Sequence, residues 1–391
     1  MEIYSPHDLL AKDYSFHRVY QPLNISATLK SKAEDFIVEE EVAIEFSGEG
    51  EHCWIYLQKK ACNTDWVAQQ LAKFCQVKKM AVSYAGLKDR HALTSQWFSV
   101  QLPGKPTPDW SAFEEFLLHG RQSDDETVRI LQSFRHNRKL QRGALKSNFF
   151  KITLRQLSDD SDDAFERLEQ RCQQISQSGV ANYFGEQRFG RGHNNLEQAI
   201  RLFSAPHKKL PKHKRSIYLS ASRSWIFNHI LSARVEQGNW DRRLAGDVFM
   251  LDGRSACFTD SSNVAGKETA MMTGVADTGG IDEAALTEIA ITEIERRLAN
   301  KEIHPTAAMW GDGEIMVTGE TAELESSIID QMPVFRDGLV AARLQAQRRA
   351  CRVIPGNLAC LRQGDDLVVS FSLPAGSYAT MVLAEIFSQL Y

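Results

Sequence analysis

The 391-residue chain lacks the sequence features of membrane proteins and of zinc-binding proteins. It contains no run of 18 apolar residues, and its first ten residues have neither the basic start nor the apolar core of a signal peptide. Its seven cysteines are scattered without a C-x-x-C pair, and no H-E-x-x-H motif is present. We therefore expect a cytoplasmic protein with reduced cysteines, no metal ion and no contact with a membrane.

An excess of positive charge is also absent, because 46 Lys and Arg residues are set against 50 Asp and Glu residues and the net charge is -4. A nucleic-acid site would therefore be a local basic surface on an acidic protein. Hydrophobic residues make up 43% of the chain and charged residues 25%, which is typical of a folded globular protein. The length favours two or three domains.

Local basic surfaces are present at two places. Residues 134–155 contain seven Lys and Arg residues and no acid, and residues 207–215, HKKLPKHKR, contain five Lys or Arg residues and two histidines. Such clusters supply the phosphate contacts of RNA-binding proteins. The alternative in each case is an ordinary solvated basic face or surface loop.

The most informative stretch is residues 81–100, AVSYAGLKDRHALTSQWFSV. Two β-type runs, residues 81–84 and 96–100, flank a turn in which Asp89 stands between two cations and close to an imidazole. Cations on both sides would keep this carboxylate ionised well below neutral pH, as a nucleophile or general base requires. A solvated Lys-Asp-Arg turn between two strands is the alternative.

The neighbouring patterns predict elements that could support such a site. Apolar residues at helical spacing predict an amphipathic helix over residues 64–76, directly before the first β-type run. A period of two at the end of the first basic stretch predicts a strand with Asn148 and Phe150 on one face. An amide beside a ring suits a flipped nucleobase, although the same pattern fits Phe150 as part of a core stripe with Ile152 and Leu154.

The C-terminal part is also predicted from its patterns. A helix is expected to begin near Pro333 and to continue into arginine-rich turns. A strand is expected over residues 367–373, and a final helix through Ile386 and Phe387.

Two motifs resemble those of the TruD family of tRNA pseudouridine synthases. The pattern G-x-K-D-x-x-A-x-T-x-Q over residues 86–96 is similar to that family's active-site signature, and residues 182–190, NYFGEQRFG, are similar to its other long motif. The resemblance runs from about Thr28 to the C-terminus. Mild departures from the bacterial pattern, which bear on the choice of tRNA more than on the reaction, are Leu87, Glu186 and His193.

This resemblance implies an α+β fold. It consists of a pseudouridine synthase-like catalytic domain with a mixed or antiparallel sheet, interrupted by an inserted α/β domain. We expect the catalytic domain to comprise residues 1–179 and 336–391 and the inserted TRUD-type domain to comprise residues 180–335. A change in composition near residues 332–333 agrees with this division.

The resemblance also implies a reaction, which is isomerisation of a uridine in tRNA to pseudouridine, at position 13 of the D-arm in the family's usual substrate. The partner would be tRNA, no obligatory protein partner is implied, and no cofactor is implied because the reaction is neither a redox step nor a group transfer. Asp89 would be the catalytic carboxylate. The substrate-binding residues would be Lys30, Phe36, Asn148 and Phe150. The candidates for contact with the RNA backbone are Arg138, Lys139, Arg142, Lys146, Arg188, Lys208 and Lys209.

Two other functions fit parts of the sequence. A catalytically silent RNA-binding protein would use the same basic surfaces, but only the enzyme would release the C5 hydrogen of uracil. A carboxylate-dependent hydrolase of nucleosides or glycosides usually needs a second carboxylate across the bond, and residues 81–100 supply only Asp89.

Overall fold

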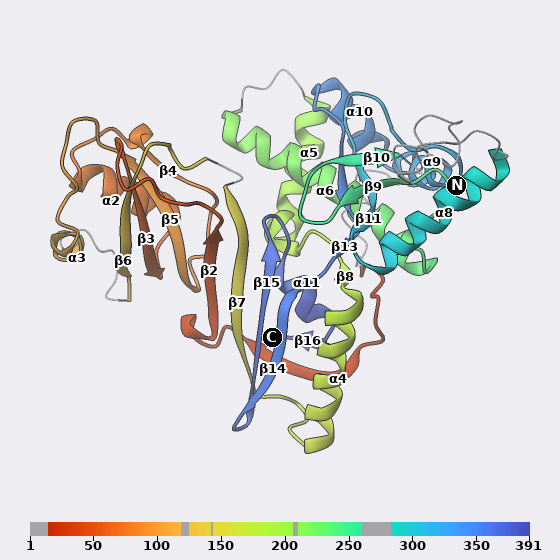
Figure 1. The fold of residues 1–391 in the computed structure, drawn as a ribbon, viewed down its shortest axis with the longest axis horizontal. Coiled ribbons are helices and arrows are strands. Elements are labelled where there is room, and N and C mark those ends of the chain that lie inside the picture. The colour runs from red at the N-terminus through yellow and green to blue at the C-terminus, as the bar shows by residue number, and fades with distance from the viewer. Residues whose placement is uncertain (1–14, 119–124, 142–143, 206–209, 260–282) are drawn as a thin grey trace. The chain divides into compact units, whose positions relative to one another are not determined.

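The computed structural model describes residues 15–118, 125–141, 144–205, 210–259 and 283–391 (Figure 1). The chain forms two compact units. The first consists of Met1–Gln21, Gly179–Val353 and Thr380–Glu385, and the second of Pro22–Ser178, Ile354–Ala379 and Ile386–Tyr391. Among the helices of the described ranges, none combines the length and the apolar character needed to cross a lipid bilayer.

The second unit is built on a sheet of ten strands within the described residues. Its main path runs in the order β14 (Gly356–Gln363), β15 (Asp366–Pro374), β7 (Leu145–Arg155), β2 (Phe36–Val42), β5 (Leu93–Gln101), β3 (His52–Lys60) and β6 (Thr127–His136). Outside this path, β1 (Leu23–Leu29) pairs with β16 (Phe387–Leu390) and β7, and β4 (Val82–Tyr84) pairs with β5. Because β2 is parallel to β5 and antiparallel to β7, the sheet is mixed, and the predicted α+β class is confirmed.

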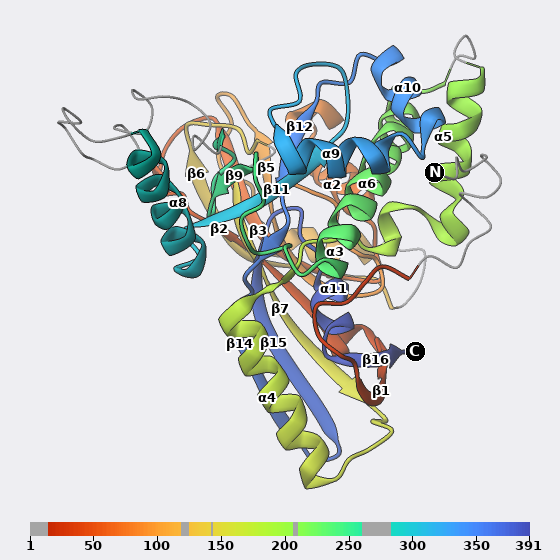
Figure 2. The same cartoon turned by 90° about the vertical axis from the view of Figure 1, so that its right-hand side faces the viewer.

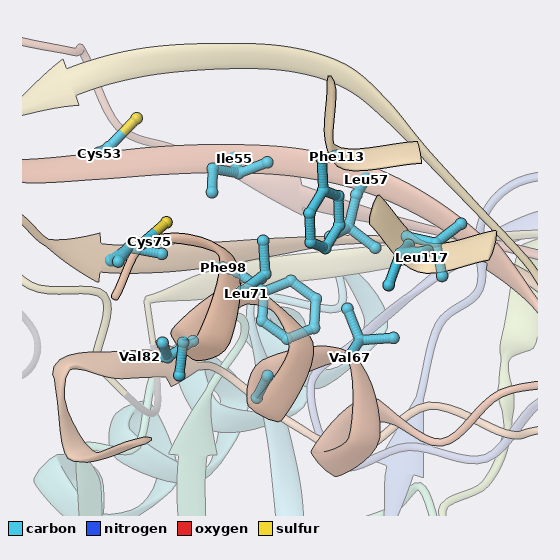
Figure 3. Packing of buried hydrophobic residues seen from close by; sticks show 14 of the residues in the cluster. Cys53, Ile55, Leu57, Val67, Leu71, Cys75, Val82, Phe98, Phe113 and Leu117 are labelled. Carbon is cyan, nitrogen blue, oxygen red and sulfur yellow. The ribbon is translucent and has the colours of Figure 1, made fainter. Parts of the chain in front are cut away.

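A hydrophobic core fixes one helix on this sheet (Figure 3). Helix α2 (Thr64–Phe74) contributes Val67 and Leu71, which pack in one buried cluster with Ile55 of β3 and Phe98 of β5. Burial of one such side chain contributes roughly 1.5–3 kcal/mol. The helix predicted over residues 64–76 is therefore confirmed, and its N-terminus is anchored close to the start of β5.

Helix α4 (Asp162–Ser178) lies along β14 in the same unit (Figures 1 and 2). Its side chains Leu168, Cys172 and Ile175 are buried against the sheet. The guanidinium of Arg362 on β14 lies 4.2 Å from the ring centroid of Phe165. Gly179 follows the helix with φ +82°, a left-handed conformation that glycine adopts without strain and that ends a helix.

Two expectations for the C-terminal part were wrong. Helix α11 (Ala379–Ala384) ends before Ile386, and Phe387 opens strand β16, which pairs in parallel with β1 through Leu23. Pairing of the backbone with a distant strand has overridden the local apolar pattern. Helix α10 (Pro333–Ala341) likewise ends before most of the arginine-rich segment, which lies on β12 (Gln347–Ala350) and β13 (Arg352–Val353).

The first unit combines helices with a four-stranded sheet. In the described residues the sheet has the order β10 (Cys257–Thr259), β9 (Val248–Leu251), β11 (Ile303–Met309) and β12. Strand β8 (Val180–Ala181) pairs with β13. In the described residues, the α-helices of this unit are α5 (Asn194–Ser204), α6 (Lys212–Glu236), α8 (Glu283–Ala299), α9 (Gly319–Ile329), α10 and, from Thr380 on, α11.

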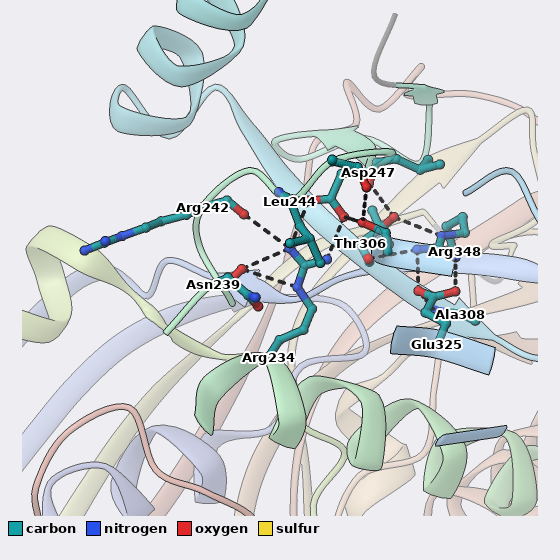
Figure 4. A network of polar contacts seen from close by, with 12 residues as sticks. Arg234, Asn239, Arg242, Leu244, Asp247, Thr306, Ala308, Glu325 and Arg348 are labelled. Atoms are coloured by element: carbon teal, nitrogen blue, oxygen red, sulfur yellow. Dashed lines mark hydrogen bonds and ion pairs between the residues drawn. The ribbon is translucent and has the colours of Figure 1, made fainter. Parts of the chain in front are cut away.

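Buried ion pairs connect helix and sheet in the first unit (Figure 4). Arg234 of α6 forms two hydrogen bonds with the Asp247 carboxylate, at 2.6 and 2.9 Å, and both side chains are fully buried. Arg348 of β12 makes a two-pronged contact with Glu325 of α9, at 2.8 Å for each nitrogen. Because a buried charge without its partner is costly, these pairs fix how α6, α9 and the sheet meet.

The first unit extends beyond the predicted inserted domain. Its long segment ends at Val353, because β12 pairs with β11 between Thr306 and Met309 and β13 pairs with β8. Residues 336–353 therefore pack with the inner segment. The assignment of residues 180–335 as an inserted domain stays a prediction.

Candidate active site

Asp89 lies on the loop between β4 and β5, two strands that pair antiparallel. Its Oδ2 atom contacts Lys30 Nζ in an ion pair, and its Oδ1 atom accepts a hydrogen bond of 2.9 Å from the backbone N–H of His91. Lys30 directly follows β1 and has φ +59°, a left-handed conformation that is uncommon for residues other than glycine. Such conformations are enriched at functional sites.

The two cations next to Asp89 in the sequence, Lys88 and Arg90, pair with other groups. Lys88 pairs with Glu40 at 2.7 Å, and Arg90 donates to the backbone oxygen of Ala61 at 2.7 Å and lies 3.6 Å from Glu126. Cations that flank an acid in the sequence therefore need not approach it in the fold. The cation that pairs with the carboxylate is therefore Lys30, 59 residues earlier in the chain.

The environment keeps Asp89 ionised. Burial acts to raise the pKa of this carboxyl, but the hydrogen bond from Lys30, the backbone N–H of His91 and the charges of these two residues leave the pKa below its ordinary value. A carboxyl with a lowered pKa stabilises the folded chain above its unfolded pKa, and this contribution is lost as the pH falls through the folded pKa. At neutral pH the carboxylate is charged and partly exposed, as a nucleophile or general base must be.

The side chains of Gln96 and Thr64 hold the loop before Asp89 in place. The Gln96 amide donates to the backbone oxygen of Gly86 at 3.3 Å, and Thr64 Oγ1 donates to Gln96 Oε1 at 2.9 Å. Thr64 Oγ1 also accepts a hydrogen bond of 3.1 Å from the backbone N–H of Lys88. Thr64 begins α2 and Gln96 lies on β5. Their hydrogen bonds therefore connect the loop to the core of the unit.

A buried lysine holds the backbone of Asp89 itself. Lys59 Nζ donates to the backbone oxygens of Cys62 and Asp89, at 2.9 and 3.0 Å, and its side chain is fully buried. Burial lowers the pKa of Lys59 to about 8. Because an unfolded lysine titrates near pH ~10.4, the unfolded chain binds more protons between these values, and this group favours the folded chain increasingly as the pH rises through that range.

We expect Lys59→Met to lower kcat by roughly ten- to a hundredfold with little change in KM, because a catalytic group displaced by about 1 Å loses about that much rate. In the described residues, the hydrogen bonds of Lys59 go to backbone oxygens, so Lys59 would act as a positioning residue. Lys60→Met is the matched control, since Lys60 is the next residue of β3 and its partly exposed side chain pairs with Glu34 at 2.9 Å. Steady-state kinetics on both variants would contradict this role if their kcat values fell equally.

A buried ion pair underlies the site. Lys88 Nζ lies 2.7 Å from Glu40 Oε1 and donates to Asn148 Oδ1 at 2.6 Å, and the Glu40 side chain is fully buried. Glu40 Oε2 also accepts a hydrogen bond of 2.9 Å from the backbone N–H of Trp97. The pair therefore joins β2, β5 and β7 and orients the carbonyl of Asn148.

Aromatic rings pack together on β2, β7 and β15. The Phe36 and Phe150 ring centroids are 6.2 Å apart at an interplanar angle of 74°, and Phe150 stacks on Phe371 at 5.5 Å and 29°. Lys30 Nζ lies 4.3 Å from the centroid of Phe36, so the same ammonium contacts Asp89 and this ring. The exposed fraction of Phe150 is only 8%, so its ring also belongs to the core stripe with Ile152.

The predicted RNA-backbone residues are placed as follows. Arg138 and Lys139 are exposed and line a cavity of about 700 Å³ in the second unit, together with Trp54 and His136. Lys146 is exposed on β7. Arg188 lies in the first unit, 5.1 Å from the ring centroid of Phe184. Three candidates, Arg142, Lys208 and Lys209, lie outside the described residues.

The sequence did not single out several residues of this site. Lys59 and Glu40 look like ordinary members of polar strands, and only their full burial distinguishes them. Phe371 is brought to Phe150 by the pairing of β15 with β7. In the described part of the chain, no three His, Cys, Asp or Glu side chains converge as a metal site would require.

The comparisons with known proteins agree along most of the chain. A family model described as tRNA pseudouridine synthase D (TruD) matches residues 17–197 and 193–386. The tRNA pseudouridine synthase D of Methylococcus capsulatus is 40% identical over 370 residues, which cover 94% of this chain and 93% of that protein. The protein of the same name from Pseudomonas syringae pv. syringae is 41% identical over 363 residues, covering 92% and 91%.

A solved structure shows the same fold. The crystal structure of a Methanosarcina mazei protein assigned as tRNA pseudouridine synthase D (TruD) superimposes with a TM-score of 0.63 and covers 99% of both chains at 22% identity. Together with the family match over most of the chain and the 40% identity to these relatives, this places the chain among the tRNA pseudouridine synthases. Within this class the family is shown by the match along the sequence: the chain belongs to the TruD family.

Proposed function

We propose that the chain isomerises a uridine of tRNA to pseudouridine, at position 13 in the D-arm, with Asp89 as the catalytic carboxylate. The observation that carries the proposal is the pairing of Asp89 with Lys30 beside the Phe36 ring. The loop that carries Asp89 is held by hydrogen bonds with the side chains of Lys59, Thr64 and Gln96. The family's relatives named tRNA pseudouridine synthase D support the substrate.

The reaction breaks the N-glycosidic bond, rotates the freed uracil and forms a bond from C5 of uracil to C1′ of the ribose, while C5 loses a proton and N1 gains one. Asp89 would act as the charged group in this step, and Lys30 would keep it ionised. The uridine must first leave its stack, which costs a few kcal/mol. Contact with the Phe150 edge and the amide N–H₂ of Asn148, whose carbonyl is already bound by Lys88, would offset this cost.

A hydrolase mechanism is less well supported. It would need a second carboxylate on the far side of the glycosidic bond. Glu40, on the neighbouring strand β2, is fully buried and is bound to Lys88 and to the backbone of Trp97. This acid is therefore part of the support of the site.

In this proposal tRNA is the partner and residues 180–335 form an inserted domain that shares in tRNA binding. The enzyme would work in the cytoplasm without an obligatory protein partner. Arg138, Lys139 and Lys146 would contact the RNA backbone.

The proposal is tested with tRNA transcripts that carry tritium at C5 of uridine. We expect the wild-type chain to release tritium to water from a transcript with U13 and to release none when position 13 is cytidine. Release of free uracil would indicate a hydrolase, and tRNA binding without any release would indicate a silent RNA-binding protein.

A further inference from the structure

Three arginines of the first unit come together on the motif NYFGEQRFG. Arg188 and Arg349 lie over one ring, with guanidinium carbons 5.1 and 4.1 Å from the centroid of Phe184. Arg349 is also 5.5 Å from the centroid of Phe227 on α6. Arg223, one helical turn before Phe227, completes the group, which we name the arginine cluster.

Each of these arginines donates a hydrogen bond to a neutral side chain. Arg349 donates to Asn182 Oδ1 at 2.6 Å, Arg188 to Ser220 Oγ at 3.0 Å, and Arg223 to Gln347 Oε1 at 3.2 Å. In the described part of the chain, Arg223 Nε is buried and has no hydrogen-bond partner. Burial, and after it the positive charge of Arg188, lower the pKa of Arg223 below its ordinary value.

The surface that carries the cluster is rigid. Asn228 of α6 donates to the backbone oxygen of Phe184 and accepts from its backbone N–H, both at 2.9 Å. Phe184 and Phe227 are buried, whereas the three arginine side chains are partly exposed. Guanidinium groups that lie over a fixed ring and remain partly exposed can bind phosphate with their N–H groups.

We propose that the arginine cluster of Arg188, Arg223 and Arg349 binds a backbone phosphate of the tRNA. This inference rests on the proposed function. Like charges held together destabilise a folded chain, and an anion that enters between them removes that repulsion. A phosphodiester provides the negative charge and several acceptor oxygens for the exposed N–H groups of the cluster.

The test compares Arg223→Gln with Arg242→Gln, which removes the same charge from an exposed arginine whose side chain extends away from the buried network in Figure 4. Binding of a tRNA transcript is measured in the Asp89→Asn background against salt concentration. We expect Arg223→Gln to weaken binding by roughly five- to tenfold near 0.1 M salt and to lower the slope of log Kd against log salt by about one. Arg223→Lys should leave the slope of log Kd against log salt unchanged. Arg242→Gln should have the same Kd and the same slope as the Asp89→Asn chain.

Turnover separates this inference from the proposed function. With Asp89 intact, Arg223→Gln should raise KM and leave kcat at saturating tRNA unchanged. If the wild-type chain turns over tRNA and Arg223→Gln matches it in KM and salt slope, only the inference fails. If inorganic phosphate raises the melting temperature through Arg223 while the tRNA slope is unchanged, the cluster binds a free anion and the proposal is wrong. If the wild-type chain releases no tritium, both the proposed function and this inference are wrong.

Discussion

Asp89→Asn is expected to lower the rate of pseudouridine formation by at least about a thousandfold. The amide has nearly the shape of the carboxylate and can still accept the hydrogen bond from the backbone N–H of His91. It carries no charge, so it cannot act as a nucleophile or a base. Tritium release from C5-labelled tRNA under single-turnover conditions measures the effect. Binding of tRNA should change by less than about twofold, because no phosphate contact is removed.

The control for this variant is Asp65→Asn. Asp65 also pairs with a lysine, Lys79, at 3.4 Å, and its pKa is also lowered, first by the hydrogen bond from Tyr84. It lies on α2, whose side chains support the active-site loop. If both variants lost activity to a similar degree, loss of a surface ion pair would explain the result and Asp89 would not be the catalytic group.

Much of the fold could be predicted from local patterns. The helix α2, the strand β7 and the helix α4 follow from apolar spacing that matches one secondary-structure period. Strand β16 could not be predicted in this way, because its pairing with β1 joins residues more than 360 positions apart. Its sequence alone fits the end of the preceding helix equally well.

The candidate site was predictable where its residues lie close together in the sequence. Asp89 stands in a motif whose residues are close in the sequence, and the structure accounts for Thr94 and Gln96 as members of the strand that supports it. The residues next to Asp89 suggested flanking cations, whereas the residue that pairs with Asp89 is Lys30, which directly follows β1 and which only the resemblance to the family had singled out. Lys59 acts through backbone oxygens, which no sequence pattern records.

Glu40→Gln is expected to destabilise the chain by about 3 kcal/mol, because it leaves the ammonium of Lys88 buried without a compensating charge. The substitution keeps the volume of the side chain, so little of the loss comes from a cavity. For a unit of this size the melting temperature should fall by roughly 6–12 °C, which differential scanning calorimetry or circular dichroism can measure.

Glu39→Gln, the control, changes the exposed preceding residue of the same strand and should alter stability by less than about 0.5 kcal/mol. Adding Lys88→Met to Glu40→Gln should recover part of the loss, since the uncompensated ammonium is then removed. Equal destabilisation by Glu39→Gln and Glu40→Gln would contradict a structural role of the buried pair. Failure of the double variant to recover any stability would show that the loss comes from the bond between Glu40 and the Trp97 backbone.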